Sequence, residues 1–335
     1  MAAEMAEQRE VLSSFAERRR RLLKELGPRM PGSLAGSLLI ARGSSDHAAT
    51  YGRYILEMAT RRPVALAAPS IITLYGTQTD CSGYLGVAIS QSGETPEIVE
   101  VAGAARASGA LVVGITNRRE SPLGEAADAL IHLDAGEERA VPATKTFTAE
   151  LAALATLAEA AGSAPWGDDD WDALPGAAGV VLTDDAPATR AAQTIADADR
   201  MFVVSRGLMY AVALEAALKI KETTGALAEG YSAADLRHGP IAAVESGVPV
   251  IVFAASGPTG SDLQSLVEAV RRKGARVVVC SDEDGADVPL PVGLPEGLMP
   301  ILGAIRAQQI AYHLALLRGL DPDSPEGLSK VTRTR

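Results

Sequence analysis

Two loops in the first half of the chain combine hydroxyl groups with glycine, a pattern that can bind phosphate. Residues 90–95 read SQSGET and follow the apolar run LGVAI, and Pro96 suits the first turn of a helix. Hydroxyls and free backbone N–H groups at a helix N-terminus bind phosphate without a lysine. A helix cap alone would need one such residue. Residues 43–46, GSSD, repeat the design after LLIA, so the candidate phosphate ligands are Ser44, Ser45, Ser90, Gln91, Ser92 and Thr95.

A second candidate for chemistry is the helical segment LEAALKIKE, residues 214–222. Glu215, Lys219 and Glu222 are spaced four and three residues apart, so they share one helix face. A solvated ion-pair stripe would have the same spacing. The segment follows the strand pattern MFVVS, however, and crossover helices pack on the sheet, which favours a functional face over a solvated one.

The third candidate is His238, which lies in the polar segment LRHGP. Isolated histidines usually belong to a core. Gly and Pro directly after this residue predict a turn, and a histidine in a polar turn is exposed and available for acid–base chemistry.

These residues lie in a chain that is built twice. An apolar run followed by Arg-Gly and a helix pattern occurs at Gly43 and again at Gly207. A buried strand followed by Ser-Gly, an amphipathic helix and another strand occurs at Gly93 and again at Gly257. Both pairs of glycines lie 164 residues apart, which indicates duplication of a whole domain. The loops of the second copy have fewer hydroxyls, so we expect the first copy to bind the phosphate.

The strand patterns predict an α/β fold of two tandem α/β/α sandwich domains with parallel sheets. Short, continuous apolar runs separated by helical segments are typical of parallel strands buried on both faces. The Gly-, Pro- and Asp-rich stretch 162–179 suggests the boundary, with a first domain at 1–170 and a second at 171–335. Residues 1–26 read as an amphipathic N-terminal helix, and a polar C-terminal tail follows the last helix.

Composition narrows the classes of function. The chain has 335 residues, of which 47% are hydrophobic and 4% aromatic, and a net charge of -11. An acidic chain with few aromatic rings is a poor nucleic-acid binder, and its apolar content excludes a disordered chain. Cys81 and Cys280 are isolated, which argues against a disulfide framework or a zinc site and predicts a cytoplasmic protein. We expect neither a signal peptide nor a membrane span.

Several longer motifs resemble one family. SQSGET, VPATKTFTAEL (141–151), LEAALKIKE, LRHGP and GLSK occur together and in order in the sugar-isomerase half of glucosamine-6-phosphate synthase and its relatives, which carry paired sugar isomerase (SIS) domains. The resemblance runs from the N-terminal EMAEQ segment to Lys330. It implies the same tandem fold that the internal repeat predicts.

The resemblance also implies a role for each candidate. The serines, Gln91 and Thr95 would hold a sugar phosphate, and Val141 and Lys219 would line the site. Glu222 would move a proton between C1 and C2 of a hexosamine or ketohexose 6-phosphate. His238 would open the sugar ring, acting in the neighbouring subunit of a homodimer. Lys330 would form a Schiff base with a ketose carbonyl. No metal or organic cofactor is implied, and neither a nucleic acid nor a membrane is an expected partner.

The implied reaction is an isomerising deamination, in which glucosamine 6-phosphate and water give fructose 6-phosphate and ammonia. The family's glutaminase domain has no counterpart here, so ammonia would not come from glutamine. Glu326 stands where the family usually has an arginine, four residues before the lysine. Altered tail closure would favour a second reaction, the elimination of water from an N-acetylhexosamine 6-phosphate by a dehydratase or lyase. A non-catalytic sugar-phosphate sensor is the third possibility.

Overall fold

The computed structural model describes residues 1–330 as two compact units. Residues 331–335, the end of the predicted tail and second domain, lie outside the described residues. We call Glu10–Glu138 with Lys145–Gly167 the first-sheet unit. The second-sheet unit contains Asp168–Lys330 together with Met1–Arg9 and Arg139–Thr144. Each unit therefore draws on separate stretches of the chain, and the boundary at residue 170 stays a prediction.

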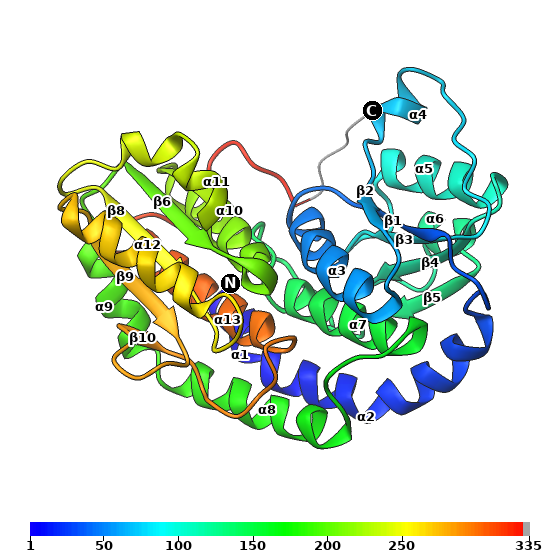
Figure 1. The fold of residues 1–335 in the computed structure, drawn as a ribbon, viewed down its shortest axis with the longest axis horizontal. Coiled ribbons are helices and arrows are strands. Elements are labelled where there is room, and N and C mark those ends of the chain that lie inside the picture. The colour runs from blue at the N-terminus through cyan, green and yellow to red at the C-terminus, as the bar shows by residue number, and fades with distance from the viewer. Residues whose placement is uncertain (331–335) are drawn as a thin grey trace. The chain divides into compact units, whose positions relative to one another are not determined.

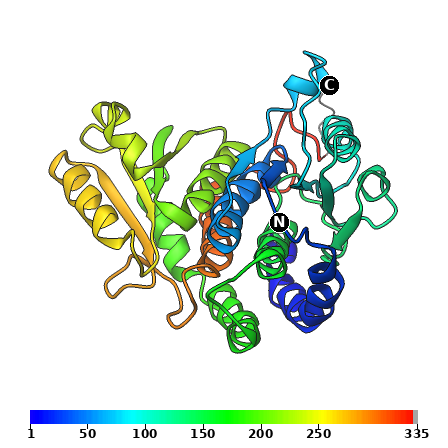
Figure 2. The same cartoon turned by 45° about the vertical axis from the view of Figure 1, so that its right-hand side comes forward.

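The first-sheet unit is built on five parallel strands in the order β2-β1-β3-β4-β5. Helices α3 and α7 pack together on one face of the sheet, and α5 and α6 cover the other (Figure 1; the unit comes forward in Figure 2). Its strands are β1 (Gly36–Ile40), β2 (Val64–Leu66), β3 (Tyr84–Ile89), β4 (Leu111–Thr116) and β5 (Ala129–His132). Its helices are α2 (Gln8–Leu26, which begins in the other unit), η1 (Gly27–Arg29), α3 (Ser44–Thr60), α4 (Ser70–Thr73), α5 (Pro96–Ala107), α6 (Pro122–Ala126) and α7 (Lys145–Ala161).

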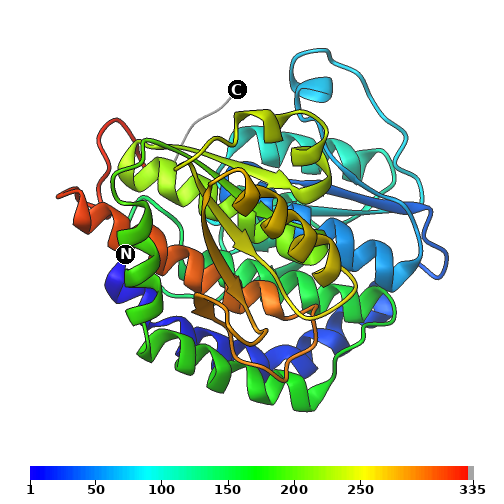
Figure 3. The same ribbon diagram turned by 60° about the vertical axis from the view of Figure 1, so that its left-hand side comes forward.

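The second-sheet unit also has five parallel strands, in the order β10-β9-β8-β6-β7. Helices α9, α10 and α13 cover one face, and α11 and α12 lie on the other, with α12 toward the viewer in Figure 3. Its strands are β6 (Arg200–Ser205), β7 (Leu227–Ser232), β8 (Pro249–Phe253), β9 (Arg276–Ser281) and β10 (Val288–Pro289). Its helices are α1 (Ala2–Ala6), α8 (Asp168–Thr183), α9 (Ala186–Ile195), η2 (Gly207–Met209), α10 (Tyr210–Thr224), α11 (Ala233–Arg237), η3 (Pro240–Ala243), α12 (Gly260–Arg272) and α13 (Met299–Leu317).

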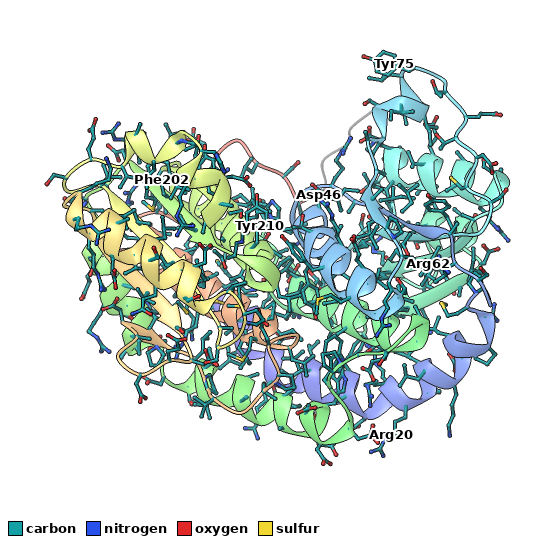
Figure 4. All side chains as sticks on the ribbon, in the orientation of Figure 1. Arg20, Asp46, Arg62, Tyr75, Phe202 and Tyr210 are labelled. Atoms are coloured by element: carbon teal, nitrogen blue, oxygen red, sulfur yellow. The ribbon has the colours of Figure 1, made fainter. Side chains whose placement is uncertain are left out.

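The two sheets have the same topology, which confirms the predicted fold class and the duplication. Numbered within its own copy, each sheet has the strand order 2-1-3-4-5. Gly43 and Gly207 both adopt a left-handed backbone, with φ of 60° and 63°. Asp46 and Tyr210, also 164 residues apart, each lie at the N-terminal end of a helix (Figure 4).

The sequence interpretation missed a helix at the predicted domain boundary and strands at the sheet edges. Most of stretch 162–179 is helical, because α8 begins at Asp168 and continues through Pro175. Strands β2, β7 and β10 were not predicted, and each lies at a sheet edge. The predicted N-terminal helix is confirmed as α1 and α2. Among residues 1–330, none of the helices combines the length and apolar character needed to cross a bilayer.

Candidate functional site

The predicted phosphate loops lie side by side at the carboxyl edge of the first sheet. Strands β1 and β3 are paired neighbours, and the helices that follow them, α3 and α5, cover opposite faces. The chain therefore diverges at this point, which is the position where open α/β sheets bind ligands. Residues 43–46 leave β1 here, and residues 90–95 leave β3.

Hydrogen bonds inside the SQSGET loop fix its hydroxyl groups. The Ser90 and Thr95 hydroxyl oxygens lie 3.2 Å apart, and the backbone N–H of Gly93 donates to the Ser90 hydroxyl at 3.2 Å. Ser92 is buried, and its hydroxyl accepts from the N–H of Glu94 at 3.2 Å. The result is a compact turn of hydroxyls and N–H groups directly before the N-terminus of α5, a local field suited to an anion.

Gly93 is required by the shape of this turn. Its φ is +64°, and a Cβ there would collide with the Ser121 hydroxyl and lie 2.9 Å from the Thr116 hydroxyl. We expect Gly93→Ala to lower the free energy of unfolding by about 1–3 kcal/mol, through backbone strain and the collision. Gly103→Ala is the matched control, because an added Cβ in the middle of α5 meets nothing within 4 Å. That change should stabilise by about 0.5–1 kcal/mol. Urea unfolding of both variants measures the difference, and equal stabilities would contradict this account of the loop.

Two arginines neutralise the acidic residue of the predicted phosphate loop and the one in the helical turn that follows it. Arg42, which precedes the first loop, makes a bidentate ion pair with Glu97 in the first turn of α5, at 2.9 and 3.1 Å. Arg118 pairs with Glu94 at 2.6 Å. The Arg42–Glu97 pair also ties the two loops together. The global charge of -11 is therefore compatible with an anion at this edge.

The hydroxyls of the first loop have different surroundings. Ser44 is half-buried in the first turn of α3. Ser45 is buried, and its hydroxyl donates to Glu150 of α7 at 2.9 Å, so this hydrogen is directed into the packing of α3 and α7. Burial raises the pKa of the adjacent Asp46, against the opposing effect of His47 and Arg42. Ser44 is the better placed of the two serines to offer its hydroxyl hydrogen to a ligand.

The equivalent loops of the second copy lack these features. Leu208 and Met209, both buried, stand 164 residues after Ser44 and Ser45. The N–H of Ser256 donates to the Asp282 carboxylate at 2.7 Å, and a Cβ on Gly257 would lie 2.6 Å from a Glu296 carboxylate oxygen. Carboxylates at this position disfavour an anion, which agrees with the prediction that the first copy binds the phosphate.

Helix α10 of the second-sheet unit carries a buried network of three charges. Lys219 and Glu215 are fully buried, with their charged groups 3.3 Å apart. Lys219 also forms a close ion pair with Glu222, whose side chain is 20% exposed. The solvated-stripe interpretation is therefore wrong, because two of the three groups have no access to water. Glu222 is the member of the network that remains accessible.

The charge on Lys219 is stabilised by its neighbours. Burial by itself lowers the pKa of an ammonium, but the carboxylates of Glu215 and Glu222 outweigh it, so the pKa of Lys219 lies above its ordinary value. Lys219 is consequently a permanent cation at neutral pH. It fixes the position of the Glu222 carboxylate.

Val141 and the C-terminal tail belong to the same unit as this network. The N–H of Val141 donates to the carbonyl of Asp323 in the tail at 3.0 Å. The tail begins at Arg318, whose guanidinium donates to the carbonyls of Ala196 and Ala198, just before β6. Lys330 is half-buried at the end of this tail.

In the second sheet, His238 lies beyond the carboxyl ends of the strands, whereas Glu222 lies near their amino ends. Helix α10 connects β6 to β7, and Glu222 near its end is five residues before β7 begins at Leu227. His238 comes after β7 ends, and the adjacent Arg237 bonds to Asp262 in the first turn of α12, which follows β8. A six-residue strand spans about 17–20 Å. His238 is exposed, as predicted, and this topology places it about one strand length from Glu222 of the same chain.

Residues 37–160 and 194–289 match the family described as the SIS domain. The chain belongs to the SIS domain family. Each matched region contains most of one of the two parallel sheets, so the two SIS domains correspond to the two copies in the sequence. The resemblance inferred from the motifs is thereby confirmed.

Relatives of these SIS domains include larger enzymes. The chain is 34% identical over 310 residues to the isomerizing glutamine–fructose-6-phosphate aminotransferase of Zymomonas mobilis. The aligned region covers 87% of this chain and 51% of that protein. The chain thus spans about half the length of the curated relatives it matches. A solved structure of a candidate phosphosugar isomerase from Silicibacter pomeroyi is 34% identical, with a TM-score of 0.81 over 96% of this chain and 99% of that one. Glucosamine-6-phosphate deaminase from Thermotoga maritima shares the fold, with a TM-score of 0.78 at 23% identity over 99% of both chains.

Sequence reasoning missed several contacts that support the candidate site residues. The Arg42–Glu97 pair joins residues 55 positions apart, and Ser45 meets Glu150 across 105 positions, so no local spacing could reveal them. Glu215 was recognised from the sequence as sharing a helix face with Lys219 and Glu222. Its complete burial could not be read from that spacing.

Proposed function

We propose that the chain is a sugar-phosphate isomerase that releases ammonia from an aminohexose 6-phosphate. The observation that carries this proposal is the α10 network, which leaves a single accessible carboxylate, Glu222, held by a buried ammonium. A fixed and partly exposed carboxylate is suited to proton abstraction. Relatives named as sugar-phosphate enzymes, among them the aminotransferase half covered here, support the substrate class.

The proposed reaction converts glucosamine 6-phosphate and water into fructose 6-phosphate and ammonia. The loops at 43–46 and 90–95 bind the phosphate through hydroxyls and N–H groups. After the ring opens, Glu222 moves a proton between C2 and C1, which turns the aldehyde at C1 into an alcohol and the C2 amine into an imine. Water adds to the imine carbon, and the C2–N bond breaks to leave the ketone and ammonia. Lys330 would hold the ketose as a Schiff base, and Val141 would line the site. Lys219, predicted to line it as well, is fully buried and would act by holding the Glu222 carboxylate.

Ring opening is assigned to His238 of a second subunit. The support is topological, since Glu222 lies near the amino ends of the strands in one sheet and His238 lies beyond their carboxyl ends. A homodimer in which each chain supplies His238 to its partner accounts for both residues, and an isologous interface supplies two such sites.

The dimer makes a complementation experiment possible. Glu222→Gln and His238→Ala, each inactive alone, should regain about a quarter of wild-type activity when unfolded together and refolded as a 1:1 mixture. Half of the dimers are then mixed, and one of their two sites has both residues intact. Each variant refolded alone is the control. A mixture that stays inactive while forming dimers would show that both residues act from the same chain.

A substrate panel decides between the proposed reactions. Purified protein is incubated with glucosamine 6-phosphate, its N-acetylated form and the two galacto epimers, and the reactions are followed for ammonia and for ultraviolet absorbance. Ammonia with a ketose 6-phosphate is the expected result. An absorbing product that retains its nitrogen would replace the proposal by dehydration, the alternative favoured by the exposed Glu326 in the tail. Binding without turnover would indicate a sensor.

A further inference from the structure

We infer that Glu4 positions the C-terminal tail that carries Lys330, by holding the segment Arg139–Thr144 to which the tail is bonded. The inference rests on the role proposed above for Lys330. Glu4 acts through the backbone of another segment, so it is a positioning residue and not a catalytic one. All the contacts involved lie within the second-sheet unit.

Glu4 is a buried carboxylate that binds two consecutive backbone N–H groups. It lies in α1, and one of its carboxylate oxygens accepts from the N–H of Arg139 at 2.5 Å and from that of Ala140 at 3.2 Å. Hydrogen bonds to an ionised acceptor are shorter and stronger than neutral ones. The partners are more than 130 residues apart in sequence, so this contact joins distant parts of the chain.

The next N–H group along the same segment is bonded to the tail. Val141 donates to the carbonyl of Asp323 at 3.0 Å, and Asp323 lies seven residues before Lys330. At the other end of the segment, the amide of Gln308 on α13 donates to the carbonyl of Thr144 at 3.2 Å. The segment is thus held by α1, by the tail and by α13.

The segment has no secondary structure of its own to order it. Residues 139–144 form neither helix nor strand, so their N–H groups have no ladder partner. Three consecutive N–H groups instead depend on Glu4 and Asp323. Ala140 is buried, and loss of the Glu4 acceptor would leave its N–H unsatisfied, so the segment would have to move to find water. That movement would break the Val141–Asp323 bond and leave the tail held at Asp323 by the Met1 ammonium, which pairs with both Glu4 and the Asp323 carboxylate.

Hydrogen exchange of Glu4→Ala tests this coupling without reference to any reaction. We expect the amides of Arg139, Ala140 and Val141 to exchange at least tenfold faster than in the wild type, because the first two lose Glu4 as their acceptor and Val141 loses the Asp323 carbonyl of the tail. Glu4→Gln keeps an acceptor oxygen and should lie between the two. Glu10→Ala, an exposed glutamate at the start of α2, should match the wild type. Unchanged exchange of Val141, whose acceptor is the Asp323 carbonyl of the tail, in a folded Glu4→Ala protein would overturn the inference.

Borohydride trapping with the substrate identified in the panel then tests whether Glu4 affects the Schiff base proposed for Lys330. Glu4→Ala should lower by at least tenfold the amount of ketose trapped on Lys330 by borohydride, and Glu4→Gln should restore most of it. Faster exchange with undiminished trapping would overturn the positioning role. If the wild type itself traps no ketose, the failure belongs to the proposed function, and the exchange of the Val141 amide still decides whether Glu4 holds the tail.

Discussion

Replacing Glu222 by glutamine is expected to lower the turnover number by about 10²–10⁴-fold, the usual contribution of a positioned acid–base group. Glutamine has nearly the same size and keeps an oxygen that accepts from the Lys219 ammonium, but it cannot take a proton from a sugar carbon. The KM for the sugar phosphate should therefore change little. Initial rates on the substrate identified in the panel measure both constants.

Two further variants show whether the loss in Glu222→Gln is chemical. Glu222→Asp retains the carboxylate but withdraws it by one methylene, so it should keep more activity than the glutamine variant. Glu268→Gln, on an exposed face of α12, should be indistinguishable from the wild type. Full activity of Glu222→Gln would show that another group takes the proton.

Lys219→Met should cost about 3–5 kcal/mol of folding free energy, the penalty for a buried charge that has lost its partner. The change leaves the Glu215 carboxylate, fully buried, without the ammonium 3.3 Å away. It also frees Glu222 to move, so activity should fall together with stability. Urea unfolding at pH 7 measures the first effect, and initial rates measure the second.

The double variant Glu215→Gln/Lys219→Met separates charge from packing. It removes both buried charges, so it should recover a large part of the lost stability but not the activity, since Glu222 stays without its partner. Lys221→Met, an exposed neighbour on α10, should change stability by less than about 0.5 kcal/mol. Equal stabilities of the Lys219 and Lys221 variants would contradict the buried network.

The effect of pH on this network follows from the raised pKa of Lys219. A group whose pKa is higher in the folded protein stabilises the fold fully below its unfolded pKa, here about 10.5, and that stabilisation is lost as the pH rises through the folded value. The gap between wild type and Lys219→Met should therefore be constant from pH 7 to 9 and shrink only in stronger alkali.

Most strands that the sequence predicted lie inside a sheet with helices on both faces, and the edge strand β5 is the exception. Runs such as LGVAI and VPVIVFA show this burial directly. Edge strand β7 reads LAEGYS, with Glu229 and Gly230 in its centre, because an edge strand can expose part of its surface. Local pattern therefore reports how deeply a strand is buried, and it misses strands that only their hydrogen bonds define.

The same limit applies to the candidate sites. Phosphate loops and the α10 face are local motifs, so glycine turns, hydroxyls and helical spacing reveal them. The Glu4 contacts to Arg139 and Ala140 and the Arg42–Glu97 pair depend on how distant segments fold together. Such supporting contacts are set by the tertiary structure and leave no pattern in a single sequence.

The two copies have diverged in complementary ways. Hydroxyls at Ser44 and Ser45 correspond to buried apolar side chains in the second copy, as described above. At the positions equivalent to Glu215, Lys219 and Glu222, the first copy has Tyr51, Ile55 and Met58. One copy thus keeps the residues proposed for anion binding, and the other keeps those proposed for proton transfer.

The composition of the second-sheet unit has a consequence for folding during synthesis. Its first nine residues leave the ribosome before any of its strands, and Arg139–Thr144 emerges within the sequence of the other unit. The first-sheet unit can therefore complete its fold once Gly167 has emerged. The segments that carry Glu4 and Val141 can pack in their own unit only after α13 and the tail have been synthesised.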